Sequence, residues 1–386
     1  MAAARVPMND HQEGSARPPE SDARVDVSVL VPVFNEERHI RDTVAAMQAQ
    51  RFAGELEFLF ADGRSGDRTS EILEELARED PRIRVFDNPR GQTPSGLNVC
   101  LRHARGEYVA RMDAHTFYPP DYLARGVQRL REGGTTWVSG PAIPQPVGRV
   151  SHAVALALSS RLGQGASSKW AAEQGDGTRP EIELDAGVFG GVWRREDVLR
   201  FGGWDEFWAK NQDSEMAGRF IEDGHKLVCL PEMGARYIPR DTLRGLFRQY
   251  RIYGFYRYAT ALRHPHTPRP THVLAPAITV TFVAAAMAPR PVRRLARAGL
   301  GLYAAALTFE TVRAIPRAEQ LSDALSLPGV FVAMHAGHGI GMLRGLVRLG
   351  PPWAPLAHIA GLDDLAKRLA PSSRPVWAPS LEAGDA

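Results

Sequence analysis

The sequence predicts an α/β fold, built on a mostly parallel β-sheet and followed by a helical, apolar C-terminal region. Short β-branched runs alternate with segments of helical periodicity through the first 115 residues, and polar residues gather where those runs end. After Tyr237 the composition shifts towards Arg, Tyr and Ala. With 386 residues, 44% apolar and 24% charged, the chain has room for two or three globular domains and is neither disordered nor fibrous.

Each strand predicted in the N-terminal part is followed by a predicted helix. The first run, VSVLVPVF at Val27–Phe34, is too short for a buried helix and is typical of a strand covered on both faces. Ile40, Val44 and Met47 then recur at helical spacing. Repeated strand-helix units imply parallel pairing, and such sheets bind ligands at the carboxyl ends of their strands. Further strands are expected at residues 56–60, 83–86 and 108–112, and further helices after residue 69 and over residues 91–104.

Polar residues follow three of these predicted strands. Asp62–Thr69 follows the second strand, Arg90 follows the third, and Asp113 and His115 follow the fourth. A single Asp at a strand end is most often a helix cap or a turn residue. Three such strand ends at one edge of a sheet indicate a ligand site instead.

These motifs resemble the GT-A glycosyltransferases of family 2, which move a sugar from a nucleotide diphosphate donor with inversion at the anomeric carbon. The resemblance spans about residues 26–240, and its specificity comes from the order and spacing of the motifs. The stretch RMDAHTFYPPDYL at Arg111–Leu123 and the C-terminal region are most similar to exopolysaccharide enzymes of the succinoglycan type, which act on lipid-linked acceptors. The matching residues are Pro32, Val33, Phe34, Asn35 and Glu36; Asp62, Gly63, Ser65, Asp67 and Thr69; Asp113, Ala114 and His115; and Asn211, Gln212, Asp213, Ser214 and Glu215.

The resemblance implies a divalent cation at Asp113 and His115. A hard cation that bridges both phosphates stabilises the charge of the leaving diphosphate without a proton. The last position of the family's DxD pattern is usually Asp, and His115 departs from it. Because imidazole suits Mn²⁺ better than Mg²⁺, the expected cofactor is Mn²⁺ or Mg²⁺, with Mn²⁺ favoured. A loop histidine held by hydrogen bonds is the alternative for His115.

The nucleoside is expected at the first two strand ends. In the family, the residues after the first strand lie against the base, and the Asp after the second holds a base N–H or a ribose hydroxyl. Arg90 is a plausible phosphate contact. For Asp67 and Thr69 we favour helix capping over catalysis, because Glu71 follows them as in a helix start. The expected donor-binding residues are Pro32, Phe34, Asn35, Glu36, Asp62, Ser65, Arg90 and Asp113.

Transfer to a hydroxyl also needs a general base, because an alcohol attacks poorly until its proton is being removed. Asp213 is the candidate, mainly by resemblance. Its motif NQDSE precedes Met216, Phe220 and Ile221 at helical spacing, which places Asp213 in a first helical turn. Acidic residues there also favour the helix dipole, so a purely structural role is the alternative.

Four further residues are assigned to the acceptor side or to phosphate. Gly190 allows close approach of the backbone to a ligand. Trp204 can stack on a sugar or belong to the core, and Glu215 shares the first helical turn with Asp213. Arg251 can clamp a lipid pyrophosphate in a bidentate fashion.

The segment from Arg236 to Arg297 is strongly basic and aromatic, with twelve Arg against one acidic residue, Asp241. Such a one-sided charge implies an anionic partner. Arg244, Arg248 and Arg251 fall on one helical face with tyrosines interleaved, a pattern found both in binders of single-stranded nucleic acid and at membrane interfaces. Because apolar stretches follow, we expect an anionic membrane surface and no nucleic acid.

Three apolar stretches follow, at Val273–Ala288, Leu300–Phe309 and Leu325–Met342. None clearly reaches the roughly 20 residues that span a bilayer, so tilted spans, interfacial helices and core helices all remain open. Gly337, Gly341 and Gly345 form a stripe of small residues at i, i+4 and i+8, which lets helices pack closely. We favour this interpretation over a dinucleotide-binding loop, because no βαβ unit follows.

The sequence therefore predicts a metal-dependent, inverting glycosyltransferase at the cytoplasmic face of the cell membrane, with a UDP-sugar as the expected donor and a lipid-linked or other amphiphilic acceptor. A soluble enzyme with a small-molecule acceptor and a non-catalytic binder of nucleotide sugars or nucleic acid are the alternatives. Two cysteines, Cys100 and Cys229, fit a reducing compartment. The expected division is a disordered tail at 1–24, the GT-A domain at 25–240, membrane-associated helices at 241–350 and a C-terminal tail at 351–386.

Overall fold

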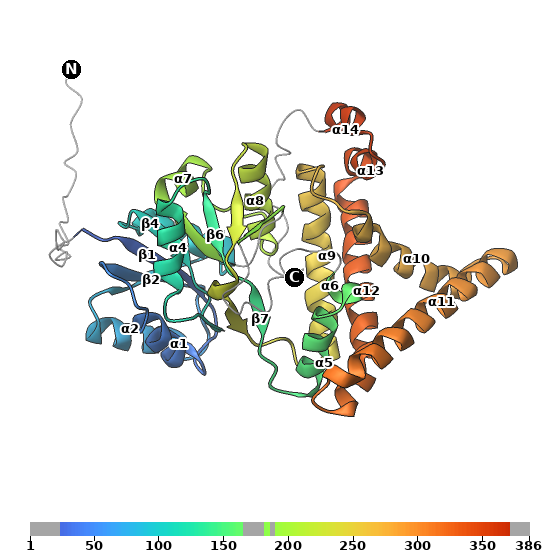
Figure 1. Ribbon diagram of the computed structural model, residues 1–386, viewed down its shortest axis with the longest axis horizontal. Coiled ribbons are helices and arrows are strands. Elements are labelled where there is room, and N and C mark those ends of the chain that lie inside the picture. Colours follow the sequence, from blue (N-terminus) through green and yellow to red (C-terminus); the bar gives the residue numbers. More distant parts are fainter. Residues whose placement is uncertain (1–23, 165–180, 186–189, 371–386) are drawn as a thin grey trace, which may run out of the picture.

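The computed structural model describes residues 24–164, 181–185 and 190–370, and Figure 1 shows an α/β domain beside a group of long helices. The tail expected at 1–24 lies almost entirely outside the described residues. Cys100 and Cys229 are both buried and free, in agreement with the absence of a disulfide framework.

The α/β domain is built on an eight-stranded mixed sheet in the order β3-β2-β1-β4-β9-β6-β10-β8. The first four strands along the chain pair in parallel, as the sequence predicts, whereas β9 runs antiparallel to both of its neighbours. The strands are β1 (Val27–Val33), β2 (Leu56–Asp62), β3 (Ile83–Asp87), β4 (Tyr108–Arg111), β6 (Trp137–Ser139), β8 (Ile182–Glu183), β9 (Gly191–Arg194) and β10 (Leu227–Cys229).

Helices cover both faces of this sheet, so its central strands are buried on both sides. Val27, Val29 and Val31 of β1 point to one core and Leu30 to the other, as strand alternation requires. One face packs against α1 (Ile40–Gln48), α2 (Thr69–Glu79) and α4 (Tyr122–Arg131), and the other against α3 (Thr93–His103), α7 (Arg195–Arg200) and α8 (Gln212–Glu222).

A small second sheet links the α/β domain to the long helices. It has the order β5-β11-β7, made of β5 (Thr116–Phe117), β11 (Ala235–Tyr237) and β7 (Ala142–Pro144). β11 is antiparallel to β5, with Tyr237 opposite Thr116. The chain then enters α9 (Leu243–Arg263), whose first turn is capped by the Thr242 side chain.

The glycine stripe of α12 (Leu321–Leu349) packs against α9, as the sequence predicts. A Cβ added at Gly341 would lie 2.0 Å from the Arg251 carbonyl oxygen, and one at Gly337 would lie 2.6 Å from the Phe247 carbonyl oxygen. Only a residue without a side chain allows the two backbones to approach so closely. Gly337 and Gly341 lie inside a continuous helix, so the dinucleotide-loop alternative is excluded.

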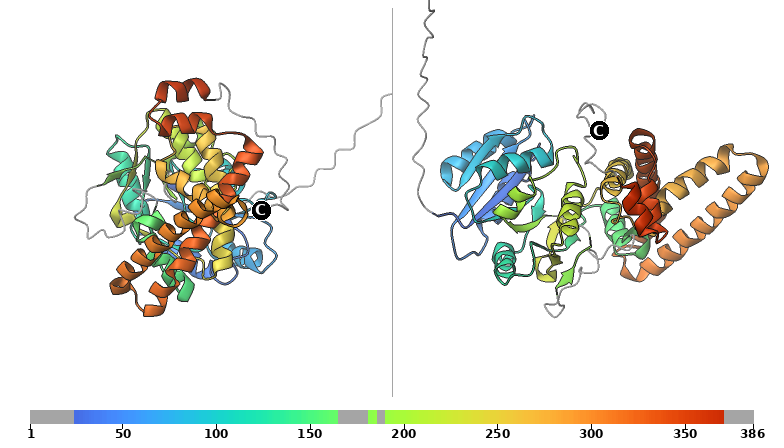
Figure 2. Two further views of the ribbon diagram at one scale, coloured as in Figure 1. Left: turned by 90° about the vertical axis from the view of Figure 1, so that its right-hand side faces the viewer. Right: turned by 90° about the horizontal axis from the view of Figure 1, so that it is seen from above.

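The helices α10 (Leu274–Met287) and α11 (Arg290–Ala314) form a hairpin that projects away from the α/β domain (Figures 1 and 2). The second and third apolar stretches lie inside the longer helices α11 and α12, and the first corresponds to α10 with the short 3-10 turn before it. Pro270–Met287 and Leu321–Leu349 are both long and apolar enough to cross a membrane. In an apolar 18-residue window of each, 22% of the residues are buried inside the protein in the first and 44% in the second.

The helical region does not begin cleanly at residue 241. The helix α5 (Arg149–Leu158) comes from within the predicted GT-A range, yet Val154 and Leu158 share a core with Leu327 and Phe331 of α12. The short helix α6 (Arg161–Gln164) follows it. The expected C-terminal tail is helical over its described part, where α13 (Trp353–Ile359) and α14 (Asp363–Leu369) form.

Candidate active site

A buried arginine, Arg111, joins the two carboxylates that the sequence analysis assigned to different tasks. Its Nε and Nη2 donate to Oδ1 and Oδ2 of Asp113 at 2.8 and 2.9 Å. Its Nη1 donates to Oδ1 and Oδ2 of Asp213 at 2.7 and 2.8 Å. The Arg111 side chain is 4% exposed, so these pairs are screened little by solvent. The candidate donor-side carboxylate and the candidate base, a hundred residues apart in sequence, therefore lie on one guanidinium.

The charges of this cluster stabilise one another. Burial opposes the ionised form of Asp113, but the Arg111 guanidinium lowers the pKa of that carboxyl below its usual range. Burial likewise opposes the charge of Arg111, and Asp113 and Asp213 raise its pKa. The pairing of Arg111 with Asp113 thus favours the charged form of both groups.

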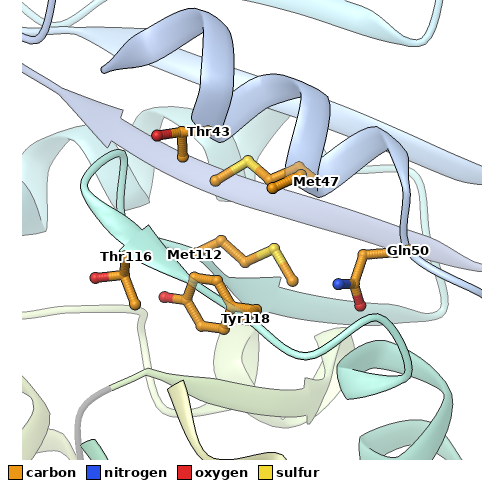
Figure 3. A pocket seen from close by; sticks show the side chains of 7 residues that line it. Thr43, Met47, Gln50, Met112, Thr116 and Tyr118 are labelled. Carbon is orange, nitrogen blue, oxygen red and sulfur yellow. The ribbon is translucent and has the colours of Figure 1, made fainter. Parts of the chain in front are cut away.

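Two elements place Asp113 and Asp213 together. Asp113 lies two residues after the end of β4, and its backbone N–H donates to the Tyr118 hydroxyl at 2.9 Å. Asp213 lies in the first turn of α8, as the sequence predicts, after Asn211 in the left-handed conformation (φ 64°). Figure 3 shows the packing beneath the Asp113 turn, where Thr43 and Met47 of α1 face Met112 and Tyr118.

The turn after Asp113 is hydrogen-bonded to α1 on one side and carries the exposed His115 on the other. The Thr43 hydroxyl donates to the Ala114 carbonyl at 2.8 Å. His115 is 53% exposed, and its Nδ1 lies 3.0 Å from Oε1 of Glu36. The hydrogen bond to Glu36 raises the pKa of His115. A hydrogen-bonded loop histidine, the alternative from the sequence, therefore describes this structure, and the exposed ring remains accessible to a cation.

The strand ends predicted to hold the nucleoside are joined by a relay of hydrogen bonds. The Ser65 hydroxyl donates to Oδ1 of Asp62 at 2.6 Å and accepts from the Asn35 backbone N–H at 2.9 Å. The Asn35 side chain accepts from the Gly66 N–H at 2.8 Å. The ends of β1 and β2 are thereby held side by side, and Phe34 at 53% exposure offers an aromatic face beside them. Pro32 lies inside β1, paired in register with Ala61 of β2.

Asp67 and Thr69 have the structural role expected of them. The Asp67 carboxylate accepts the backbone N–H of Thr69, the first residue of α2, at 3.0 Å. The Thr69 hydroxyl accepts the N–H of Glu36 at 2.8 Å, which ties the two loops together.

Comparisons with known proteins identify the family of this chain. The sequence profile of glycosyl transferase family 2 matches residues 28–171. The succinoglycan biosynthesis protein ExoA of Rhizobium meliloti (strain 1021) is 30% identical over 287 residues, which cover 72% of this chain and 82% of that protein. The chain belongs to glycosyl transferase family 2. The predicted fold class, a GT-A-like α/β domain followed by a helical C-terminal region, is confirmed.

Two further proteins resemble this glycosyltransferase. A dolichyl N-acetyl-alpha-D-glucosaminyl phosphate 3-beta-D-2,3-diacetamido-2,3-dideoxy-beta-D-glucuronosyltransferase of Methanococcus voltae is 24% identical over 59% of this chain and 71% of that one. Among solved structures, the mannosyltransferase PcManGT of Pyrobaculum calidifontis in complex with GDP-Man and Mn²⁺ is 20% identical, with a TM-score of 0.45 over 87% of this chain and 91% of that one.

Two residues assigned to the acceptor side belong to the interior of this family 2 enzyme. Trp204 is 1% exposed and packs edge-on against the buried Trp193, so neither ring has a face to offer a sugar. Glu215 is fully buried and pairs with Arg219 at 2.9 Å and Arg263 at 3.3 Å. Both assignments are corrected: in the first turn of α8, Glu215 points into the protein, whereas Asp213 pairs with Arg111.

The other assigned residues differ in their distance from the cluster. Gly190 lies beside it, with φ of 66° and the space of its missing Cβ 3.4 Å from the Arg111 carbonyl oxygen. Arg90 pairs with Glu206 at 2.6 Å instead of standing free for phosphate. Arg251 packs its backbone against Gly341 of α12. Tyr253, also on α9, interacts electrostatically with Asp113. Arg251 lies two residues before Tyr253, which is a rotation of about 200° around the helix axis.

Three cations near the two carboxylates were not predicted from the sequence. Arg111 was noted only as part of a resembling stretch, although its position two residues before Asp113 on a strand places both side chains on one face. Lys210 and Arg240 were not singled out. Lys210 interacts electrostatically with Asp113, Asp213 and Arg240. The loss of solvent around its ammonium group lowers the pKa of Lys210, although the two carboxylates oppose this effect.

The described residues suit a divalent cation that is coordinated partly by the protein and partly by a bound substrate. They contain no group of three His, Cys, Asp or Glu side chains that could hold a metal by themselves. Asp113 and His115 supply two ligands at most, which suits a divalent ion that takes its other ligands from substrate phosphates and water.

Proposed function

We propose that this family 2 glycosyltransferase moves a sugar, with inversion, from a nucleotide diphosphate donor to a hydroxyl of a lipid-linked or other amphiphilic acceptor. The single observation that carries the proposal is the Arg111 bridge between Asp113 and Asp213. It brings a donor-side carboxylate and an acceptor-side carboxylate to one point at the edge of the sheet, the arrangement that in-line displacement needs.

Asp213 acts as the general base that accepts the proton of the attacking hydroxyl. Arg111 orients its carboxylate from the protein side through two contacts of 2.7 and 2.8 Å. Asp62, Ser65 and Asn35 hold the nucleoside loops, and the exposed Phe34 ring lies against the base. Asp113 and His115 would hold Mn²⁺ or Mg²⁺, which supplies charge neutralisation to the departing diphosphate.

The acceptor class rests on the C-terminal region and on the names of the relatives. One relative is named for succinoglycan biosynthesis and the other for transfer to a dolichyl-linked sugar phosphate. The helix α10 is apolar and largely unburied, and Arg290, Arg293, Arg294 and Arg297 follow it at the start of α11. Such a pattern fits a protein seated on an anionic bilayer, and we place the enzyme at the cytoplasmic face of the cell membrane. Family membership favours an enzyme over the non-catalytic binder, and the soluble enzyme with a small-molecule acceptor is the second candidate.

A donor and acceptor screen tests the proposal. Purified full-length protein with Mn²⁺ or Mg²⁺ is incubated with each radiolabelled UDP- or GDP-sugar and a bacterial lipid extract. We expect one donor to release its nucleoside diphosphate and to place label in the organic phase. Label found only in water-soluble products supports the soluble alternative, and release from no donor contradicts the proposal.

A further inference from the structure

The loop that precedes the candidate base is attached to α9 through one buried hydroxyl. The Trp208 indole N–H and the Asn211 side-chain amide both donate to Oγ1 of Thr260, each at 2.9 Å. The same hydroxyl donates to the Tyr256 carbonyl oxygen at 2.9 Å. A threonine hydroxyl offers one donor and two acceptor positions, so all three are in use. Thr260 and Trp208 are fully buried, so the contact is closed to water.

Asn211 sets the start of the helix that carries Asp213. It is the N-cap residue of α8, and its carbonyl oxygen accepts the Glu215 N–H at 3.1 Å. Its backbone is left-handed, with φ of 64°, a conformation that Asn tolerates better than most residues do. The Asn211 side chain makes no capping hydrogen bond to the first turn of α8, all of which the structure describes. Its amide donates to Thr260 instead.

A second side chain of α9 holds the same loop. Arg263 follows Thr260 by three residues, so both lie on one face of the helix. Its Nη1 donates to Oδ2 of Asp205 at 3.1 Å, and its guanidinium lies over the Trp208 ring, 5.2 Å from the ring centroid. The Arg263 side chain is 9% exposed. Residues 205–211 are therefore attached to α9 at both ends.

The attachment of this loop constrains Asp213. Figure 1 shows α8 beside α9, and a Cβ added at Gly218 of α8 would lie 2.6 Å from the His264 ring of α9. Because Asn211 and Gly218 are both held, the first turn of α8 has a fixed direction. That direction brings the Asp213 carboxylate to its contacts of 2.7 and 2.8 Å with Arg111. A catalytic group that is displaced by about 1 Å can lose about 100-fold in rate.

We propose that Thr260 is a positioning residue for Asp213, whose hydroxyl fixes the left-handed Asn211 and so directs the base towards the acceptor. The inference rests on the proposed function, in which Asp213 is the base. The loops that we assign to the nucleoside follow β1 and β2 and are held by their own hydrogen bonds. Loss of the Thr260 hydroxyl therefore lowers turnover and leaves nucleotide affinity nearly unchanged.

Turnover and nucleotide affinity of the full-length protein in detergent test the inference. Thr260→Val keeps the shape of the side chain but leaves two buried N–H donors unpaired, whereas Thr260→Ser keeps the hydroxyl. Thr311→Val is the matched control, because the Thr311 hydroxyl is also buried but donates to Leu307 of its own helix, at 2.8 Å. We expect Thr260→Val to lower turnover by about 10- to 100-fold. Thr260→Ser should recover most of the turnover, and the control should match the wild type.

Hydrogen–deuterium exchange of the same proteins gives a readout that does not depend on activity. We expect Thr260→Val to accelerate exchange in residues 208–216, while the other helices of the α/β domain exchange as in the wild type. A uniform acceleration across the protein indicates a general loss of stability and overturns the inference. If the wild type transfers no sugar but the acceleration is local, the attachment of the loop stands and the proposed function fails.

Comparison with Asp213→Asn separates the inference from the proposed function. Turnover near that of the wild type in Thr260→Val, beside a loss in Asp213→Asn, overturns the inference alone. Turnover near that of the wild type in both variants contradicts the base itself. An equal loss of turnover and nucleotide affinity in Thr260→Val, or no recovery in Thr260→Ser, also overturns the inference. If Thr260→Val does not fold, Asn211→Gly replaces it with the same expectations, because Gly keeps the left-handed backbone and removes the amide.

Discussion

At the scale of single residues, the candidate active site depends on how Arg111 divides its hydrogen bonds. Two of its nitrogens hold Asp113 and the third holds Asp213. Removing one partner of a buried ion pair leaves an uncompensated charge and is strongly destabilising. Conservative substitutions that keep a hydrogen-bond acceptor therefore separate chemical roles from structural ones at this cluster.

His115 provides a test of the cation at this scale. The variant His115→Asp restores the carboxylate that the family usually has, so we expect it to retain transfer and to shift preference from Mn²⁺ towards Mg²⁺. Asp113→Asn should lose transfer by at least about 100-fold, because it removes a carboxylate ligand. Transfer rates with each metal, together with Mn²⁺ binding followed by electron paramagnetic resonance, measure both effects. Full activity of the wild type in EDTA would contradict a role for the metal.

The sequence singled out Asp113 and Asp213 as candidates but not Arg111, which joins them. Motif order was sufficient to select Asp62, Asp113 and Asp213, because strand ends and helix starts impose their spacing. Motif order alone did not show that Glu215 is buried and Asp213 is not. The side of the first helical turn that faces the core depends on packing against α9. Trp204 was ambiguous for the same reason: an indole packs equally well in a core or in a cleft wall.

At the scale of elements, α8 and α9 are joined by a buried ionic cluster behind the site. Glu215 of α8 lies 3.7 Å from Nε2 of His264, and Nδ1 of His264 lies 2.9 Å from Oε1 of Glu222. His264 is 1% exposed. Burial opposes its charge, but Glu215 and Glu222 outweigh that effect and raise the pKa of His264. The cluster links the helix that carries Asp213 to the helix that enters the apolar region.

The raised pKa of His264 predicts a pH-dependent stability. The folded state binds the proton more tightly than the unfolded chain, so the contribution is fully present below the unfolded pKa of about 6.5 and is lost as pH rises through the higher folded value. We expect the thermal midpoint of the wild type to fall between about pH 6 and pH 8 more steeply than that of His264→Gln, which should itself be destabilised by about 2 kcal/mol at pH 6. Parallel pH profiles of the two proteins would show that His264 is not charged in the fold.

The limits of sequence reasoning are also visible at the element scale. Strand and helix order in the first 115 residues followed from periodicity, because β1, β2 and β4 are buried on both faces and the helices on one. Helix α5 could not be assigned to the helical region in this way. Its core partners, Leu327 and Phe331, lie more than 160 residues further along the chain, and local pattern carries no information on such a contact.

At the scale of the whole molecule, the α10–α11 hairpin stands apart from the compact body (Figure 2). Its apolar side chains are widely exposed, with Met287 at 81% and Leu302 at 74%. Val280, Val283, Leu295 and Phe309 are exposed on the same two helices. So large an apolar surface marks an interaction site, and the neighbouring arginines favour an anionic lipid surface as its partner.

Flotation with liposomes tests this role of the hairpin. Full-length protein should float with vesicles that contain anionic lipid, and less so at high salt. The double variant Val283→Asp with Leu302→Asp should weaken partition by about 100-fold or more, since each buried charge costs about 3 kcal/mol. Leu199→Asp, at an exposed apolar residue of the α/β domain, is the matched control and should float as the wild type does. If the wild type stays in the soluble fraction without detergent at low salt, the hairpin serves another partner.

The central claim is that Asp213, held by Arg111 beside Asp113, is the base that activates the acceptor. The most direct measurement compares turnover and nucleotide affinity in Asp213→Asn and the wild type. The Asn side chain still accepts a hydrogen bond from Arg111, and Asp121→Asn, at a surface Asp–Arg pair, serves as the control. We predict that Asp213→Asn lowers turnover by about 10² to 10⁴ with nucleotide affinity nearly unchanged. Turnover close to that of the wild type, or an equal loss of turnover and nucleotide binding, would contradict the account.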